Sequence, residues 1–204
     1  MQPEFDPRFT VTLAALRKAG ACYGGYNKLV RSLQGQPFTE EDEDRNSYIH
    51  FKHDAEIPLL DILKSNGLDD AIWTLLCVSG ADRDLRLFAV WCARQVEHLM
   101  EDQRSKDALN VAERFANGDA SDEEFAAARA AARAAACAAA GAAARAAAWA
   151  AAGAAREAAG DAARDAAWAA AEDAAWAAAR DAQAEMFKRM CLGTAPWQQE
   201  KAVA

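Results

Sequence analysis

Apolar residues recur at helical spacing along the first half of the chain. Near the N-terminus this pattern predicts short helices over Thr10–Lys18 and Tyr26–Leu33. Each would be only two or three turns long, so both depend on tertiary packing for their stability. The segment Tyr48–His53, with two aromatic residues close to a histidine, is predicted as a brief extended strand.

The helical pattern becomes stronger after Ile57. Apolar residues from Leu59 to Leu63 predict a helix that ends at Asn66–Gly67, because glycine readily adopts the left-handed conformation that stops a helix. A second helix is predicted over Leu68–Val78. The short Asn-Gly junction predicts that the two helices form an antiparallel hairpin.

Two further helices are indicated by capping residues. Asp82 is predicted to cap a helix whose apolar stripe runs from Leu85 to Leu99. Ser105 is predicted to cap the next one, which ends at Asn117–Gly118.

The segment from Ala126 to Ala182 is mainly alanine, with 38 Ala among its 57 residues. Alanine is the best helix former, and Ser121 with Glu124 makes an S-x-x-E capping box that predicts the start of this helix. One unbroken helix would extend roughly 100 Å, so we expect the tract to fold back, with bends at Gly153 and Gly160. Because alanine methyl groups bury little area, the core must come mainly from the first 125 residues.

Together these patterns predict an all-α protein in which short helical hairpins pack against an Ala-rich helical hairpin or small bundle. We expect an N-terminal helical region over 1–80, with an acidic loop near 39–56, and a second helical region over 81–192, which contains the Ala-rich tract 125–182. Residues 193–204 are expected to form a C-terminal tail, in which Trp197 packs back or remains free. The absence of an apolar run of about 18 residues and of a signal-peptide pattern is typical of a soluble cytoplasmic protein.

The chain has a formal net charge of −8, and its acidity lies in residues 1–125, where 14 Lys and Arg against 23 Asp and Glu give −9. Such a surface repels nucleic-acid phosphates and favours a protein partner with a basic surface. An alternative in which the Arg and Trp residues of the Ala-rich tract stack on nucleic acid is disfavoured by the equal number of acids in that tract. The candidate partner-binding residues are Glu40, Glu41, Asp42, Glu43, Asp44, Asp54, Glu56, Asp69 and Asp70. The run from Glu40 to Asp44 is also typical of a solvated loop.

Motifs of common enzyme classes are missing, including the P-loop, G-x-S-x-G, G-x-G-x-x-G and H-E-x-x-H. The best candidate metal ligands are His50, His53, Asp54 and Glu56, because imidazoles and carboxylates suit zinc or manganese. They lack the rest of a coordination set at any recognised spacing, so a polar loop is the simpler interpretation. The five cysteines show no metal or redox spacing and are expected to be reduced. We therefore expect neither an enzyme nor a cofactor.

A resemblance to a known family rests on residues 87–96, "LFAVWCARQV", and on residues 105–117, "SKDALNVAERFAN". Together with the capping box and the alanine tract punctuated by Arg and Trp, these stretches resemble the immunity protein family of bacteria and their phages. The likeness covers roughly Asp82 to Leu192, and "LAALRKAGAC" and "LKSNGLDDAIWTLL" look similar to the N-terminal regions of phage and prophage proteins that carry this segment. The resemblance implies an all-helical protein that binds and neutralises another protein. It implies no particular target and no site residues.

The expected function is therefore non-catalytic inhibition by stoichiometric binding through an acidic surface. The inhibitor would be of the immunity, antitoxin or phage counter-defence type, anti-CRISPR proteins included, and its partner a toxin or a bacterial defence component. Two alternatives remain open. One is a structural protein that self-assembles into homo-oligomers through its alanine faces, and the other is a metal-dependent enzyme that uses His50 and His53.

Overall fold

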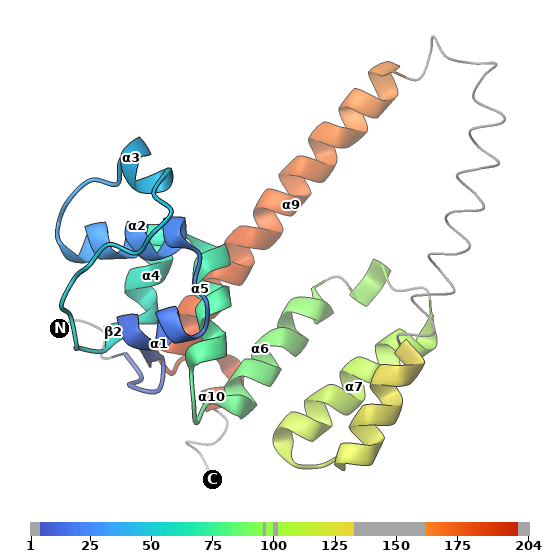
Figure 1. Ribbon diagram of the computed structural model, residues 1–204. Helices are drawn as coiled ribbons and strands as arrows, with labels where there is room; N and C mark the ends of the chain where they lie inside the picture. Colours follow the sequence, from blue (N-terminus) through green and yellow to red (C-terminus); the bar gives the residue numbers. More distant parts are fainter. Residues whose placement is uncertain (1–4, 96, 100–101, 133–161, 200–204) are drawn as a thin grey trace. The chain divides into compact units, whose positions relative to one another are not determined.

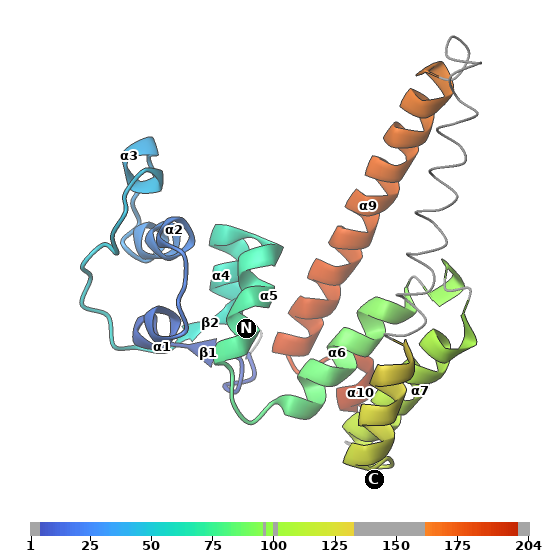
Figure 2. The same ribbon diagram turned by 45° about the vertical axis from the view of Figure 1, so that its right-hand side comes forward.

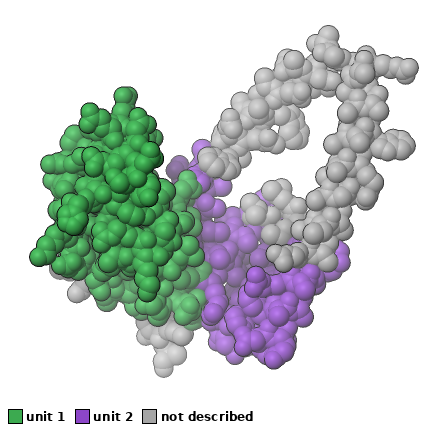
Figure 3. All heavy atoms as spheres, viewed as in Figure 1, with its two compact units in different colours: residues 1–85, 184–204 green, residues 86–183 purple. Residues whose placement is uncertain are grey.

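The computed structural model describes residues 5–95, 97–99, 102–132 and 162–199 (Figure 1). These residues are mainly helical, which confirms the predicted all-α fold, and the sheet found among them has only two strands of two residues each. The chain divides into two compact units, of which the first comprises residues 1–85 with 184–204 and the second residues 86–183 (Figure 3).

The first unit begins with strand β1 (Thr10–Val11), followed by helices α1 (Leu13–Lys18), α2 (Tyr23–Leu33) and α3 (Glu40–Glu43). Helix α1 starts three residues later than predicted. Its N-cap is Thr12, whose Oγ1 accepts a hydrogen bond of 3.1 Å from the backbone N–H of Ala15. The residues before the cap pair with another strand, which removes them from the helix.

That partner is strand β2 (Ile57–Pro58), which pairs antiparallel with β1. Helices α4 (Leu59–Asn66) and α5 (Leu68–Thr74) follow it and lie side by side in both views (Figures 1 and 2). Gly67 between them has a φ of 98°, as expected for a glycine that ends a helix. Helix α5 is shorter than predicted because a 3₁₀ turn replaces its last residues, and the predicted strand over residues 48–53 is an irregular loop instead.

The C-terminal segment completes the first unit. Residues 184–191, the end of helix α9 (Ala162–Cys191), belong to this unit and include four buried residues, and the short helix α10 (Pro196–Gln199) buries Trp197. The indole Nε1 of Trp197 donates a 3.0 Å hydrogen bond to the Asp84 carboxylate, which also pairs with Arg8 at 2.9 Å. Residues 193–199 are thus folded, although the sequence pattern suggested a tail. The largest fully buried side chains of this unit are Phe9, Leu13, Tyr26, Val30, Ile57, Leu59, Ile62, Phe187 and Met190.

The second unit holds most of helix α6 (Asp82–Arg94), a 3₁₀ turn (Glu97–Leu99), helix α7 (Gln103–Asn117), a helix over residues 122–132 and residues 162–183 of helix α9. Arg94 of α6 contacts Glu113 of α7 at 2.7 Å. The rings of Phe115 and Phe125 stack with centroids 4.5 Å apart and join α7 to the next helix, which runs beside it in both views (Figures 1 and 2).

Several predicted helix ends in this unit are confirmed and others are wrong. Ser121 and Glu124 form the predicted capping box, with hydrogen bonds of 2.9 and 3.2 Å to each other's backbone N–H groups. Asp82 is the first residue of α6 rather than its cap, and α6 ends at Arg94 instead of continuing to Leu99. Helix α7 begins before Ser105 because Asp102 is its N-cap, as the 2.9 Å bond from the Arg104 N–H to the Asp102 carboxylate shows.

The Ala-rich tract is described in part. Helix α9 contains its last 21 residues, from residue 162 to residue 182, whereas the predicted bends at Gly153 and Gly160 lie outside the described residues. Within the part of the chain that the structure describes, no helix has both the length and the apolar character needed to cross a membrane.

Candidate functional site

The predicted acidic run is a short helix, α3, and not a solvated loop. Thr39 and Asp42 form a capping box, in which each side chain accepts a hydrogen bond from the other residue's backbone N–H. Asp42 is only 1% exposed and receives two hydrogen bonds from the Arg31 guanidinium, at 2.8 and 2.9 Å. These bonds from Arg31 lower the pKa of Asp42 to about 2.

The burial of Asp42 leaves four carboxylates on the surface of α3 and at its end. Glu40, Glu41, Glu43 and Asp44 are all exposed, and none makes a side-chain hydrogen bond or ion pair within the described part of the chain. The backbone that carries them is fixed to α2 through the bidentate pair of Asp42 with Arg31. We call these four residues the acidic surface of α3.

The other predicted partner-binding residues lie on two further segments of the first unit. Asp54 and Glu56 are exposed in the loop before β2, where Glu56 accepts a 3.0 Å hydrogen bond from Thr10. Asp69 and Asp70 lie in the first turn of α5, Asp69 exposed and Asp70 half-buried. The nine predicted residues are thus distributed over three segments, and one of them, Asp42, has a buried carboxylate that a partner would not contact.

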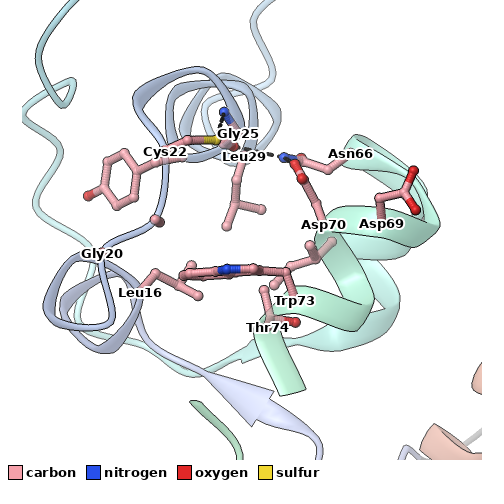
Figure 4. Close-up of a pocket in the computed structure, with 13 residues that line it drawn as sticks. Leu16, Gly20, Cys22, Gly25, Leu29, Asn66, Asp69, Asp70, Trp73 and Thr74 are labelled. Atoms are coloured by element: carbon pink, nitrogen blue, oxygen red, sulfur yellow. Dashed lines mark hydrogen bonds between the residues drawn. The ribbon is translucent and has the colours of Figure 1, made fainter. Parts of the chain in front are cut away.

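A cavity of about 370 Å³ lies among α1, α2, α4 and α5 of the first unit. Such a volume is within the range of small-molecule pockets. Figure 4 shows the Trp73 indole extending across one side of the cavity, with Leu29 of α2 opposite. Its apolar lining also includes Leu16, Tyr26 and Ile62.

The polar lining of this cavity is acidic. It contains Asp69 and Asp70 of α5 and Asn66 of α4, and the lining residues, all within the described part of the chain, include no Lys, Arg or His. The Asn66 side-chain amide donates 2.7 Å hydrogen bonds to the Gly25 carbonyl and to Oδ2 of Asp70 (Figure 4). Asp70 therefore faces α2 from a fixed position.

Gly25 allows this close approach of α5 to α2. A Cβ atom at this position would lie 2.8 Å from Oδ2 of Asp70 and 3.1 Å from the sulfur of Cys22, shorter than ordinary van der Waals distances. A glycine in the first turn of a helix costs conformational entropy. Here it leaves room for the Asp70 carboxylate, which is favoured beside the positive N-terminal end of α2.

The candidate metal ligands do not form a site in the structure. His50, His53 and Asp54 line a second cavity of about 370 Å³ together with Arg17 and Lys52, whose positive charges oppose a bound cation. The ring of His53 stacks on Phe51 at a centroid distance of 5.6 Å. No group of three or more His, Cys, Asp or Glu side chains within the described ranges is arranged to hold a metal ion.

The described cysteines are free thiols, as predicted. Burial raises the pKa of Cys92 to about 11 and that of Cys191 to about 12, so both thiols are protonated at neutral pH. Because the thiolate is the reactive form of cysteine, neither is suited to nucleophilic catalysis. Cys137 lies outside the described residues.

Comparisons with known proteins do not assign the chain to a family: no protein-family model, curated protein or solved structure matches it. The resemblance to the immunity protein family therefore stays a prediction. The candidate site rests on the geometry of the first unit, where the acidic surface of α3 and the acidic cavity beside α5 are the two features with distinctive chemistry.

Sequence reasoning found the carboxylates but missed the cavity. Leu16, Leu29, Ile62 and Trp73 each fall within a helix predicted from the sequence, where apolar side chains are expected to pack in the core. Their convergence depends on how four separate helices pack, and no local pattern encodes it. The adjacent glycines at residues 24–25, which the structure places in the first turn of α2, are the signal in the sequence for a close approach.

Proposed function

We propose that the protein acts without catalysis, as a stoichiometric inhibitor of the immunity, antitoxin or phage counter-defence type. Its acidic surface would dock on a basic surface of the protein that it inhibits, a toxin or a bacterial defence component. The observation that carries this proposal is the acidic surface of α3, which exposes four carboxylates on a backbone anchored by the buried pair of Asp42 and Arg31.

The anchoring supports binding because a fixed surface loses little conformational freedom when a partner docks. The capping box fixes the backbone at the start of α3, and the hydrogen bonds from Arg31 fix the buried side chain of Asp42. Complementary charge accelerates the encounter of two proteins and excludes partners of the wrong sign. Arg45 follows the four carboxylates directly and is exposed, so the acidic surface has a defined boundary at that end.

The net charge of the whole chain supports the same choice of partner. At −8, the protein attracts basic surfaces over distances of about a Debye length, roughly 8 Å at physiological salt. A duplex or single-stranded nucleic acid would be repelled, because its binding depends on Lys and Arg that release phosphate counterions.

The test compares two variants with the same change in charge. The first, Glu41→Lys with Glu43→Lys and Asp44→Lys, reverses three of the four carboxylates of the acidic surface of α3 and leaves Asp42 intact. The second, Asp61→Lys with Asp107→Lys and Asp122→Lys, reverses three exposed carboxylates on other helices. A partner identified by affinity purification from cells that carry toxin and phage-defence systems is then purified, and its dissociation constant is measured with each variant.

We expect reversal at α3 to weaken binding roughly tenfold or more at low salt, and the control to change it by no more than about threefold. Binding of the unmodified protein should also weaken as salt is raised. Equal effects of the two variants would mean that only overall charge matters. Unchanged binding of the α3 variant would remove this surface from the interface.

A further inference from the structure

We propose that the cavity among α1, α2, α4 and α5 binds a small organic cation, a protonated amine on a compact apolar body, with the Asp70 carboxylate as its counter-ion and the Trp73 indole as its apolar wall. This site is separate from the acidic surface of α3, and it holds whether or not the protein is an inhibitor.

The charge of the ligand follows from the lining. Two carboxylates and no Lys, Arg or His line the cavity, whose residues all belong to the described part of the chain. The Nη1 of Arg17 donates a 2.9 Å hydrogen bond to the hydroxyl of Tyr26, a lining residue, but Arg17 itself does not line the cavity. An anionic ligand would therefore find no cationic side chain in the lining, whereas a cation gains a counter-ion.

Hydrogen bonding identifies Asp70 as the group that the ligand contacts. Asn66 is fully engaged, since its Nδ2 donates to Gly25 and Asp70 and its Oδ1 accepts from the Ser65 hydroxyl at 2.7 Å. Thr74 donates its hydroxyl proton to the Ala71 carbonyl at 2.7 Å. Asp70 uses Oδ2 toward Asn66, and its Oδ1 accepts no hydrogen bond within the described residues. This oxygen can accept a hydrogen bond from an ammonium N–H group of the ligand.

The apolar walls define the rest of the ligand. Leu16, Leu29 and Ile62 offer only hydrocarbon, and Trp73 presents an indole ring that extends across the cavity beside Asp70 (Figure 4). An aromatic face attracts a nearby cation as well as burying apolar surface. A carboxylate next to an aromatic ring and aliphatic walls is thus suited to an amine that carries an aromatic or aliphatic body.

The volume favours a small molecule over a protein segment. At about 370 Å³ the cavity is close to the lower end of the range for small-molecule pockets, and residues of four helices line it. The acidic surface of α3, by contrast, is an exposed group of carboxylates suited to a protein surface. The two sites therefore call for ligands of different classes.

The test uses three probes with the same indole ring and different head groups: tryptamine with an ammonium, tryptophol with a hydroxyl and indole-3-acetate with a carboxylate. Each is titrated into the full-length protein by isothermal calorimetry. We expect tryptamine to bind at least tenfold more tightly than tryptophol, and indole-3-acetate not to bind. Equal affinity of the amine and the alcohol, or no binding of tryptamine, would overturn the proposal.

Two variants assign the site. Asp70→Asn removes the charge but keeps an oxygen that can accept the Asn66 hydrogen bond, and Asp61→Asn removes an exposed charge on α4 outside the cavity. We expect Asp70→Asn to abolish the preference for tryptamine over tryptophol, while Asp61→Asn retains it. A similar loss in both variants would show that tryptamine responds only to net charge and would overturn the assignment to Asp70.

The side-chain N–H signal of Trp73 in NMR spectra, assigned with Trp73→Phe, reports where the probe binds. It should shift on addition of tryptamine at the concentration at which calorimetry shows binding. Shifts confined to the other tryptophans would place the probe elsewhere. A lysine-containing peptide that binds through Asp70 when tryptamine does not would show that the cavity serves a protein segment instead. Because these variants leave residues 40–44 unchanged, failure here is distinguishable from failure of the proposed inhibitor.

Discussion

Helices α2 and α9 differ in what fixes them in place. The 11 residues of α2 include four buried ones, Tyr26, Asn27, Leu29 and Val30. In the 30-residue α9, the side chains are described from residue 177 onward, and the buried ones among them, Met186, Phe187, Met190 and Cys191, all fall in its last six residues. Alanine propensity is enough to form a helix, but large side chains are needed to give it a defined position.

Polar contacts add to this difference. Asn27 of α2 donates to the Ser47 carbonyl at 3.0 Å and accepts from the Ile49 N–H at 2.8 Å, so it fixes the loop that follows α3. Arg31 of the same helix holds Asp42. Residues 177–182 of α9, by contrast, comprise four alanines with Arg180 and Asp181, and an alanine side chain has no polar group that could contact a neighbour.

The difference between α2 and α9 predicts that the largest loss of stability follows from a substitution at Phe187, which is fully buried at the C-terminal end of α9. Phe187→Ala should lower the free energy of unfolding by about 3–5 kcal/mol, because it removes a large ring and leaves a cavity. Urea unfolding followed by circular dichroism measures the change. Lys188→Ala, one residue further on and exposed, should stay within about 0.5 kcal/mol. A small loss at Phe187 would mean that α9 is not held by its end.

The second largest loss of stability is expected from a substitution at Asp42, and its size depends on pH. Since its pKa is lowered to about 2 in the folded state, from 3.8, this carboxylate stabilises the fold above about pH 4, and the contribution is lost as pH falls from about 4 to about 2. Asp42→Asn should therefore be less stable than the unmodified protein at pH 7, with a difference that shrinks toward pH 2. Urea unfolding at several pH values tests this.

Asp44→Asn is the matched control, because it removes an exposed carboxylate two residues away. It should leave both the stability at pH 7 and its decline in acid nearly unchanged. If the stability of both variants declined in acid equally less than that of the unmodified protein, the pair of Asp42 with Arg31 would not be what anchors α3.

The smallest effect is expected at Ala178, an exposed position of α9. Ala178→Gly should reduce stability by about 1 kcal/mol or less, the difference in helix propensity between the two residues. Ala71→Gly in α5 should cost more, because Ala71 is fully buried and also loses a packed methyl group. Thermal unfolding of the two variants side by side makes the comparison, and equal losses would indicate that α9 is packed as tightly as α5.

The helix ends show what the sequence can predict. Gly67 and Gly118 were each expected to stop a helix, and both have positive φ, at 98° and 85°. These signals are local, since a glycine in a left-handed conformation needs no distant partner. The capping box of Ser121 with Glu124 was predictable for the same reason.

The interior of the acidic run could not be predicted in the same way. Five consecutive carboxylates look alike in the sequence, and only the approach of Arg31 from α2 selects Asp42 for burial. The spacing of Thr39 to Asp42 was a local hint, but the usual capping box has Glu or Gln at the last position. Strands β1 and β2 were missed because two residues are too few to show an alternating pattern.

The contact of Trp197 with Asp84 has a consequence for synthesis on the ribosome. Asp84 and its other partner Arg8 emerge early, whereas Trp197 follows more than 100 residues later. At roughly 5–20 residues per second, the nascent chain waits on the order of 10 seconds for the indole that completes this hydrogen bond. Until then residues 1–85 also lack Phe187 and Met190, so the first unit reaches its final fold only after the whole second unit has been translated.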